Sequence, residues 1–176
     1  MSELKIVNYP DPVLLSVGKP VNDADFGVHF EKTIETMFSV MEKAGGVGLA
    51  APQVGISKRF FVMDIPAETE KGRDRERHVL INPEILRVEG EQIGEEGCLS
   101  FPGLFQTIKR DMRVIVKARN QHGGEIEMDL DGLAARCVLH ETDHCDGIVF
   151  LDRMTPLKRE LAKRKIKRLQ ATGKWD

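Results

Sequence analysis

The sequence is poor in aromatic residues and cysteines, and it has no long apolar run. Aromatic side chains make up only 6% of its 176 residues, with one tryptophan and one tyrosine. No run approaches the roughly 20 apolar residues that a membrane-spanning helix needs, which excludes such a helix. The chain does not begin with a basic region followed by an apolar stretch, so we expect no secretory signal and a cytoplasmic location.

The three cysteines, Cys98, Cys137 and Cys145, are too few for a disulfide framework. In a reducing compartment a cysteine is a core residue, a metal ligand or a nucleophile. With 41% hydrophobic and 31% charged residues, the composition is that of a folded chain rather than a disordered one. We expect a single domain over residues 1–176.

Positive and negative charges nearly balance over the whole chain but are unevenly distributed along it. Residues 153–176 carry nine basic and two acidic side chains, a net charge of +7, whereas residues 1–152 carry a net charge of −9. We expect a basic C-terminal helical tail, which indicates a polyanionic or acidic partner, although a solvated helix face has the same composition. No RNA-binding fold motif or interleaving of aromatic and basic residues is present, which disfavours sequence-specific nucleic-acid binding.

The periodicity of the apolar residues predicts three helices and several short strands. The helices are expected at residues 25–44, at 133–145, and from Thr155-Pro156 onward. We expect residues 66–77 to form an exposed loop, because they are charged and lack an apolar pattern. The expected strands are 59–65, 78–82, 84–89, 104–109, 112–119 and 125–130. The expected apolar stripe of the last helix is Leu157, Leu161, Ile166 and Leu169. Strands in blocks with helices at the ends favour the α+β class.

Residues 140–144 form a His-Glu-x-x-His motif on the second predicted helix. His140 and His144 are four residues apart, so both imidazoles face the same way and can bind one metal ion. Glu141 then lies beside the open coordination position, where it can take a proton from water. The motif therefore predicts a hydrolytic metal centre.

Two histidines do not complete a catalytic site, which normally has three protein ligands. In one protease pattern a third histidine lies six residues after the second, but here that residue is Phe150. In another pattern a downstream glutamate binds the metal, and the only one available, Glu160, lies in the basic tail. We therefore expect an upstream ligand, and Cys98 beside Gly97 is suitable because a thiolate binds iron(II) or zinc strongly.

Three motifs, in this order, make the chain resemble the bacterial-type peptide deformylase family. The family patterns Gly-x-Gly-x-Ala-Ala-x-Gln, Glu-Gly-Cys-Leu-Ser and His-Glu-x-x-His stand here at residues 46–53, 96–100 and 140–144. The resemblance covers nearly the whole chain. It implies an α+β fold in which short antiparallel strands surround a central metal-binding helix, with an amphipathic N-terminal helix and a basic C-terminal helix.

The resemblance also implies a reaction and a metal. Cys98, His140 and His144 would hold one divalent ion, with iron(II) as the native metal and zinc, nickel or cobalt as replacements. Glu141 would serve as general base and then general acid while formate is released from an N-formylmethionyl nascent peptide.

Further roles follow from the same resemblance. The Gln53 side chain and the Leu99 backbone N–H would donate hydrogen bonds to the developing oxyanion. The basic tail would bind the ribosome, and no membrane is implied. The residues implied to contact the peptide are Val47, Gly48, Gly97, Leu133 and Cys137.

Alternative classes are a zinc endopeptidase that uses the same His-Glu-x-x-His helix and a non-catalytic binding module stapled by a metal. Formate release from a formylated peptide distinguishes the deformylase from both.

Overall fold

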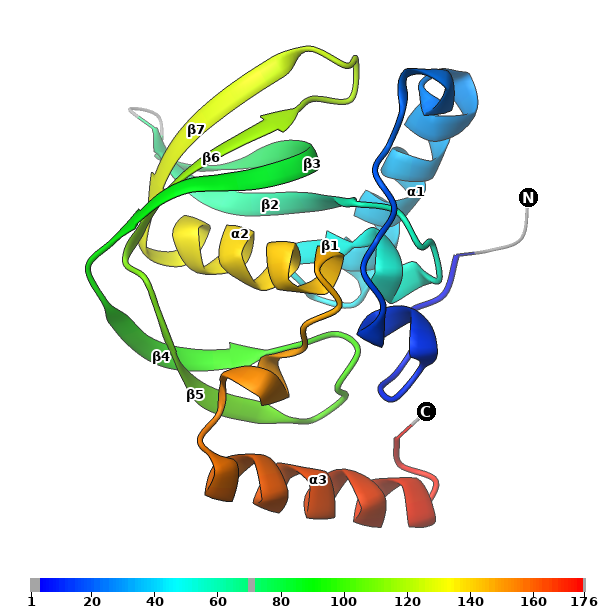
Figure 1. Cartoon of the computed structure of the whole chain (residues 1–176), viewed down its shortest axis with the longest axis vertical. Coiled ribbons are helices and arrows are strands. Elements are labelled where there is room, and N and C mark those ends of the chain that lie inside the picture. Colours follow the sequence, from blue (N-terminus) through cyan, green and yellow to red (C-terminus); the bar gives the residue numbers. More distant parts are fainter. Residues whose placement is uncertain (1–3, 70–71, 176) are drawn as a thin grey trace.

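Two antiparallel sheets enclose a central helix in the computed structural model, which describes residues 4–69 and 72–175 (Figure 1). The larger sheet has the strand order β1-β2-β3-β6-β7, and the smaller pairs β4 with β5. The strands are β1 (Gly48–Ala50), β2 (Phe60–Thr69), β3 (Gly72–Glu89), β4 (Gln92–Gly97), β5 (Phe105–Arg110), β6 (Arg113–Arg119) and β7 (Glu125–Asp131). The helices are α1 (Val28–Lys43), α2 (Gly132–Cys145) and α3 (Pro156–Ala171). Short 3-10 helices are η1 (Pro12–Leu15), η2 (Asp23–Asp25), η3 (Ala51–Val54) and η4 (Phe150–Arg153). The expected α+β class is confirmed.

The first part of strand β2 is covered on both of its faces, which explains why residues 60–63 are all apolar. Successive side chains of a strand point to opposite faces. Phe60 and Val62 therefore pack in the cluster beneath α1, whereas Phe61 and Met63 pack against α2. All four side chains are buried.

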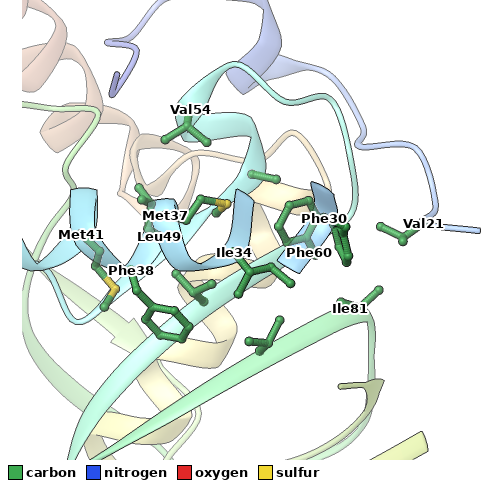
Figure 2. Packing of buried hydrophobic residues seen from close by; sticks show 13 residues of the cluster. Val21, Phe30, Ile34, Met37, Phe38, Met41, Leu49, Val54, Phe60 and Ile81 are labelled. Atoms are coloured by element: carbon green, nitrogen blue, oxygen red, sulfur yellow. The ribbon is translucent and has the colours of Figure 1, made fainter. Parts of the chain in front are cut away.

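Helix α1 contributes the largest share of the first cluster, as Figure 2 shows. Its buried residues recur every three or four positions, so they form one face directed at β2 and β3. Burying one such side chain stabilises the fold by roughly 1.5–3 kcal/mol. The buried residues of this face are Phe30, Ile34, Met37, Phe38 and Met41.

A third cluster lies between the β4–β5 sheet, η4 and α3. Phe101 packs against Phe150 and Trp175 in this cluster, which also contains Ile166 of α3. Cys98 is partly buried and lies against the same cluster. The C-terminal helix is thus packed beneath the segment that carries this cysteine (Figure 1).

The structure corrects the expected loop at residues 66–77. Strands β2 and β3 continue through this segment as a two-stranded ribbon, in which Pro66 pairs with Arg75 and Ile65 with Glu76. Backbone pairing holds this ribbon together, and its sequence shows no apolar alternation that would have predicted two strands. Pro66 and residues 75–77 are exposed, as expected, and residues 70 and 71 lie outside the described residues.

One other expectation about the strands is wrong, and two strands were not expected. Residues 78–82 and 84–89 belong to one strand, β3, with a register shift between Ile81 and Glu84. Asn82 adopts a positive φ of 52° at this irregularity, and its side chain is bonded to the backbone of Val21. Pro83 has no N–H to donate to a sheet, so the sequence predicted that a strand ends before it. Strands β1 and β4 were not expected, because both are short and rich in glycine or charge.

The expected apolar stripe of α3 is also partly wrong. Leu157 and Leu161 are exposed at 72% and 55%, whereas Ala162 and Ile166 are buried. The face of α3 that packs against the domain therefore includes the small side chain of Ala162. Within the part of the chain that the structure describes, no helix is long and apolar enough to cross a membrane.

Candidate metal centre and active site

The two histidines of the motif lie one turn apart on α2, and their rings are 5.0 Å apart between centroids. Cys98 approaches them from the segment after β4, and its Sγ lies 3.3 Å from Nε2 of His144. One donor atom from each of Cys98, His140 and His144 lies within 4.8 Å of the others. The three expected ligands therefore converge on one point.

This donor set fits a divalent metal ion. Bond lengths of about 2.3 Å to sulfur and 2.0 Å to nitrogen, at a tetrahedral angle, place the two donors about 3.5 Å apart. The observed sulfur–nitrogen distance of 3.3 Å is close to this value. One thiolate and two imidazoles suit zinc or iron(II), and three protein ligands leave one position open, as in catalytic sites.

The orientation of His140 is determined by Glu96. Its Nδ1 lies 3.0 Å from a Glu96 carboxylate oxygen, which leaves Nε2 for the metal. Burial alone would raise the pKa of Glu96, but hydrogen bonds with His140 and Arg110 outweigh it and hold that pKa well below its usual range. Burial would likewise lower the pKa of His140, yet its bonds with Cys98 and Glu96 raise it. Glu96 is therefore a carboxylate that keeps the imidazole in place.

A network of charged side chains, buried except for Arg153, surrounds this carboxylate and was not predicted from the sequence. The Arg110 Nε donates to Glu96 at 2.8 Å, and the Arg136 Nη1 donates to it at 2.7 Å. Arg110 also donates to Asp143 at 2.5 Å, and Arg153 donates to Asp143 at 3.0 Å. Buried charges require partners. The only signal in the sequence was that Glu96 and Asp143 lie inside two of the motifs.

Glu141 is buried at 4% exposure, and burial raises the pKa of its carboxyl to about 7. Among the described residues its Oε2 has no hydrogen-bond partner. A side chain at Gly48 would come within 2.5 Å of Glu141 Oε1 and 2.8 Å of Cys137 Sγ, so the site needs glycine there. A carboxyl with a pKa near neutrality can both accept and return a proton.

Gln53 is held with its amide nitrogen toward Cys98. The backbone N–H of Ala50 donates to its Oε1 at 2.8 Å. This leaves Nε2 to donate to Ser100 Oγ at 3.4 Å and to Cys98 Sγ at 3.5 Å. The side chain is 1% exposed, so its orientation is fixed by the fold.

A cavity of about 530 Å³ opens in front of these groups. Leu133 is half exposed, and the Cys137 Sγ donates to the Val47 carbonyl at 3.7 Å. His144 is buried and does not line the cavity, whereas every other residue expected to act in the site lines it. Those residues are Val47, Gly48, Gln53, Gly97, Cys98, Leu99, Leu133, Cys137, His140 and Glu141. The structure thus brings the expected metal, catalytic and peptide-contacting residues together.

The family model of the polypeptide deformylases matches residues 3–160. The chain belongs to this family. A peptide deformylase of Acidobacterium capsulatum is 45% identical over 170 residues, which are 97% of each chain. The crystal structure of a deformylase from Legionella pneumophila is similar with a TM-score of 0.83, at 44% identity, covering 95% of this chain and 96% of that one. A deformylase structure from Ehrlichia chaffeensis has a TM-score of 0.84 at 35% identity, covering 98% and 99%. The resemblance inferred from the three motifs is confirmed.

Proposed function

We propose that this deformylase removes the formyl group from the N-terminal formylmethionine of newly made polypeptides and releases formate. The observation that carries the proposal is the convergence of Cys98, His140 and His144 on one point. Glu141 and Gln53 line the cavity in front of that point. Because its substrate is a nascent chain, we place the enzyme in the cytoplasm, where such chains are made.

The three ligands would hold a divalent ion, which supplies a Lewis acid and activates water near neutral pH. We propose iron(II) as the native ion, with zinc, nickel or cobalt as replacements, because a thiolate ligand suits all of them. Glu141 accepts a proton from the attacking water while the water oxygen bonds to the formyl carbon. When the carbon–nitrogen bond breaks, Glu141 returns that proton to the leaving amine. The products are formate and a free amino terminus.

Gln53 stabilises the negative charge that develops on the formyl oxygen. Its Nε2 is already directed toward Cys98 by the bond that Oε1 accepts from Ala50. The Leu99 backbone N–H is the second donor in this proposal. Losing one donor of this kind typically costs about 10²–10³ in rate.

The cavity would hold the methionine side chain against Leu133 and Cys137. Strand β1 is an edge strand of the larger sheet, and Gly48 lies on it. An extended peptide can add to such an edge through backbone hydrogen bonds. Val47, Gly48 and Gly97 line the cavity at this place, so we propose that they pair with the peptide.

The function is tested by formate release from formyl-Met-Ala-Ser with the metal-loaded enzyme. We expect formate and free Met-Ala-Ser as the only products, with internal peptide bonds left intact. An endopeptidase would instead cleave an unformylated peptide and release no formate, and a non-catalytic module would do neither. Absence of formate at any metal loading would exclude deformylation.

We further propose that α3 binds the ribosome. The helix lies on the outside of the molecule, beneath the β4–β5 sheet (Figure 1). Its buried face explains how it packs on the domain but does not explain the net charge of +7 over residues 153–176. The substrate emerges from a particle whose surface is rich in RNA phosphate, and contacts with phosphate are electrostatic and weaken steeply with salt.

Charge reversal on α3 should abolish co-sedimentation with ribosomes at low salt. Deformylation of a free formylated tripeptide should remain unchanged, because none of the altered side chains lines the cavity. The four residues to be replaced by glutamate are Lys163, Arg164, Lys167 and Arg168.

A control variant separates the location of the charge from its amount. It carries four Lys-to-Glu changes on exposed lysines elsewhere, which alter the net charge by the same amount, and it should still sediment. Continued sedimentation of the α3 variant would contradict the proposal and leave α3 as a solvated helix face. The control positions are Lys5, Lys19, Lys32 and Lys43.

A further inference from the structure

The chain returns to the body of the molecule after α3, where Trp175 is buried. Gly173 has a positive φ of 63°, and the Lys174 N–H donates to the Leu169 carbonyl at 2.9 Å, so the backbone reverses at the end of the helix. Trp175 is 3% exposed, although most of α3 before it is exposed. Figure 1 shows this end of the chain (red) close to the segment around η1 (blue).

The indole of Trp175 is bonded to the N-terminal segment. Its Nε1–H donates to the Tyr9 carbonyl at 2.6 Å. The Asn8 side-chain Nδ2 donates to the Trp175 carbonyl at 2.7 Å. Residues 8 and 9 and the end of the chain therefore hold each other in place.

The same N-terminal segment is bonded to two parts of the active site. The Tyr9 N–H donates to the Ser100 carbonyl at 3.0 Å, and the Val7 N–H donates to the Gln53 carbonyl at 2.8 Å. Ser100 in turn accepts from the Gln53 Nε2 through its hydroxyl. Hydrogen bonds of the N-terminal segment thus connect the Trp175 indole with the backbone of Ser100 and with that of Gln53, the proposed oxyanion donor.

A second connection runs through aromatic rings. Trp175 packs edge-on against Phe101, with ring centroids 6.0 Å apart and an interplanar angle of 84°. Tyr9 stacks on Phe101 at 4.9 Å. The Phe101 N–H donates to the Cys98 carbonyl at 2.9 Å, which closes the turn that carries the thiol. Aromatic pairs of this kind contribute about 0.5–1.5 kcal/mol beyond the area they bury.

We propose that Trp175 is a positioning residue for the metal centre. Cys98 lies in the irregular segment between β4 and β5, so no regular element holds the thiol opposite the two histidines of α2. Tyr9 and Phe101 fix the position of that segment, and Trp175 contacts both of them. This role of Trp175 concerns the position of the metal ligands and does not depend on the proposed function. Only the expected effect on turnover rests on that function.

The test compares Trp175→Ala with Trp175→Phe and Ile166→Ala. Ile166 is buried to 2% exposure in the same cluster, but it does not bond to Tyr9, so its variant controls for lost packing. Each protein is loaded with cobalt(II). We measure the rate of metal loss to a chelator, the thiolate-to-cobalt absorption band, the thermal midpoint, and kcat and KM for formyl-Met-Ala-Ser.

Partners that orient metal ligands typically change affinity or activity 10–100-fold when lost. We expect Trp175→Ala to lose cobalt about tenfold faster, to shift the absorption band, and to lower kcat with KM nearly unchanged. Trp175→Phe, which keeps a ring against Phe101, should recover part of each effect. Ile166→Ala should lower the thermal midpoint without changing the rate of metal loss or the band.

The proposal is overturned if Trp175→Ala and Trp175→Phe lose cobalt at the wild-type rate with an unshifted band, whatever their thermal midpoints. It is also overturned if Ile166→Ala accelerates metal loss as much as Trp175→Ala does, because loss of packing would then explain both. The cobalt measurements involve no substrate. Failure of every variant and of the wild type to release formate would therefore refute the proposed function alone.

Discussion

Replacing Cys98 with alanine should remove the metal and with it almost all deformylation. The variant leaves two imidazoles one turn apart on α2, and a stable catalytic site normally requires a third protein ligand. The metal lowers the barrier by several kcal/mol, and each 1.4 kcal/mol corresponds to a factor of ten. We therefore expect activity to fall about 10³-fold or more. Metal content after dialysis, measured together with formate release, checks this result.

The other two cysteines provide the matched controls. Cys145 is fully buried in the core, and Cys137 is buried beside Glu141. Burial raises the pKa of both thiols, which disfavours the thiolate that a metal would need. Cys145→Ala and Cys137→Ala should each retain one equivalent of metal. One equivalent in dialysed Cys98→Ala protein would refute the ligand assignment.

Replacing Glu141 with alanine should abolish most turnover while the metal stays bound. Glu141 is proposed to move the proton rather than to bind the ion, so the three ligands remain intact. General acid–base groups contribute about 10²–10⁴-fold, and a residue that acts in both steps should lie toward the upper end. The measurement is kcat on formyl-Met-Ala-Ser at a metal occupancy established for each preparation.

Glu160→Ala is the control for this second variant. Glu160 is the only glutamate downstream of the motif, and it lies on α3 with an exposed side chain. An endopeptidase-like site would use it as a ligand, so its loss would lower both metal content and activity. We expect neither to change. Wild-type turnover in fully loaded Glu141→Ala enzyme would remove Glu141 from the mechanism.

The local part of the site could be predicted from the sequence. The spacing of His140 and His144 on a helix brings both rings to one face regardless of how the helix packs. Because no suitable ligand follows the motif, the third ligand was expected upstream, where Cys98 is suitable. Because β2 is sandwiched between α1 and α2, its apolar run identified it as a buried strand.

The ribbon at residues 66–77 and strand β4 could not be predicted in this way. Their backbones pair with a neighbouring strand, but their sequences show no alternation of apolar and polar residues. The face of α3 that packs on the domain was also not predicted, because Ala162 is small and Leu157 is exposed. Periodicity records side-chain burial, so it says little about elements held mainly by backbone hydrogen bonds.

The sequence by itself determined the family and the class of fold and predicted the metal ligands, because the motifs and the periodicity of the apolar residues are local features of the chain. Only the tertiary structure decided how these ligands are supported. The hydrogen bond between His140 and Glu96, the ion pair of Arg110 with Asp143, and the hydrogen bond of Trp175 to Tyr9 join residues that are 33 to 166 positions apart. Contacts over such separations are set by how the sheets and helices pack, and no local pattern in the chain encodes them.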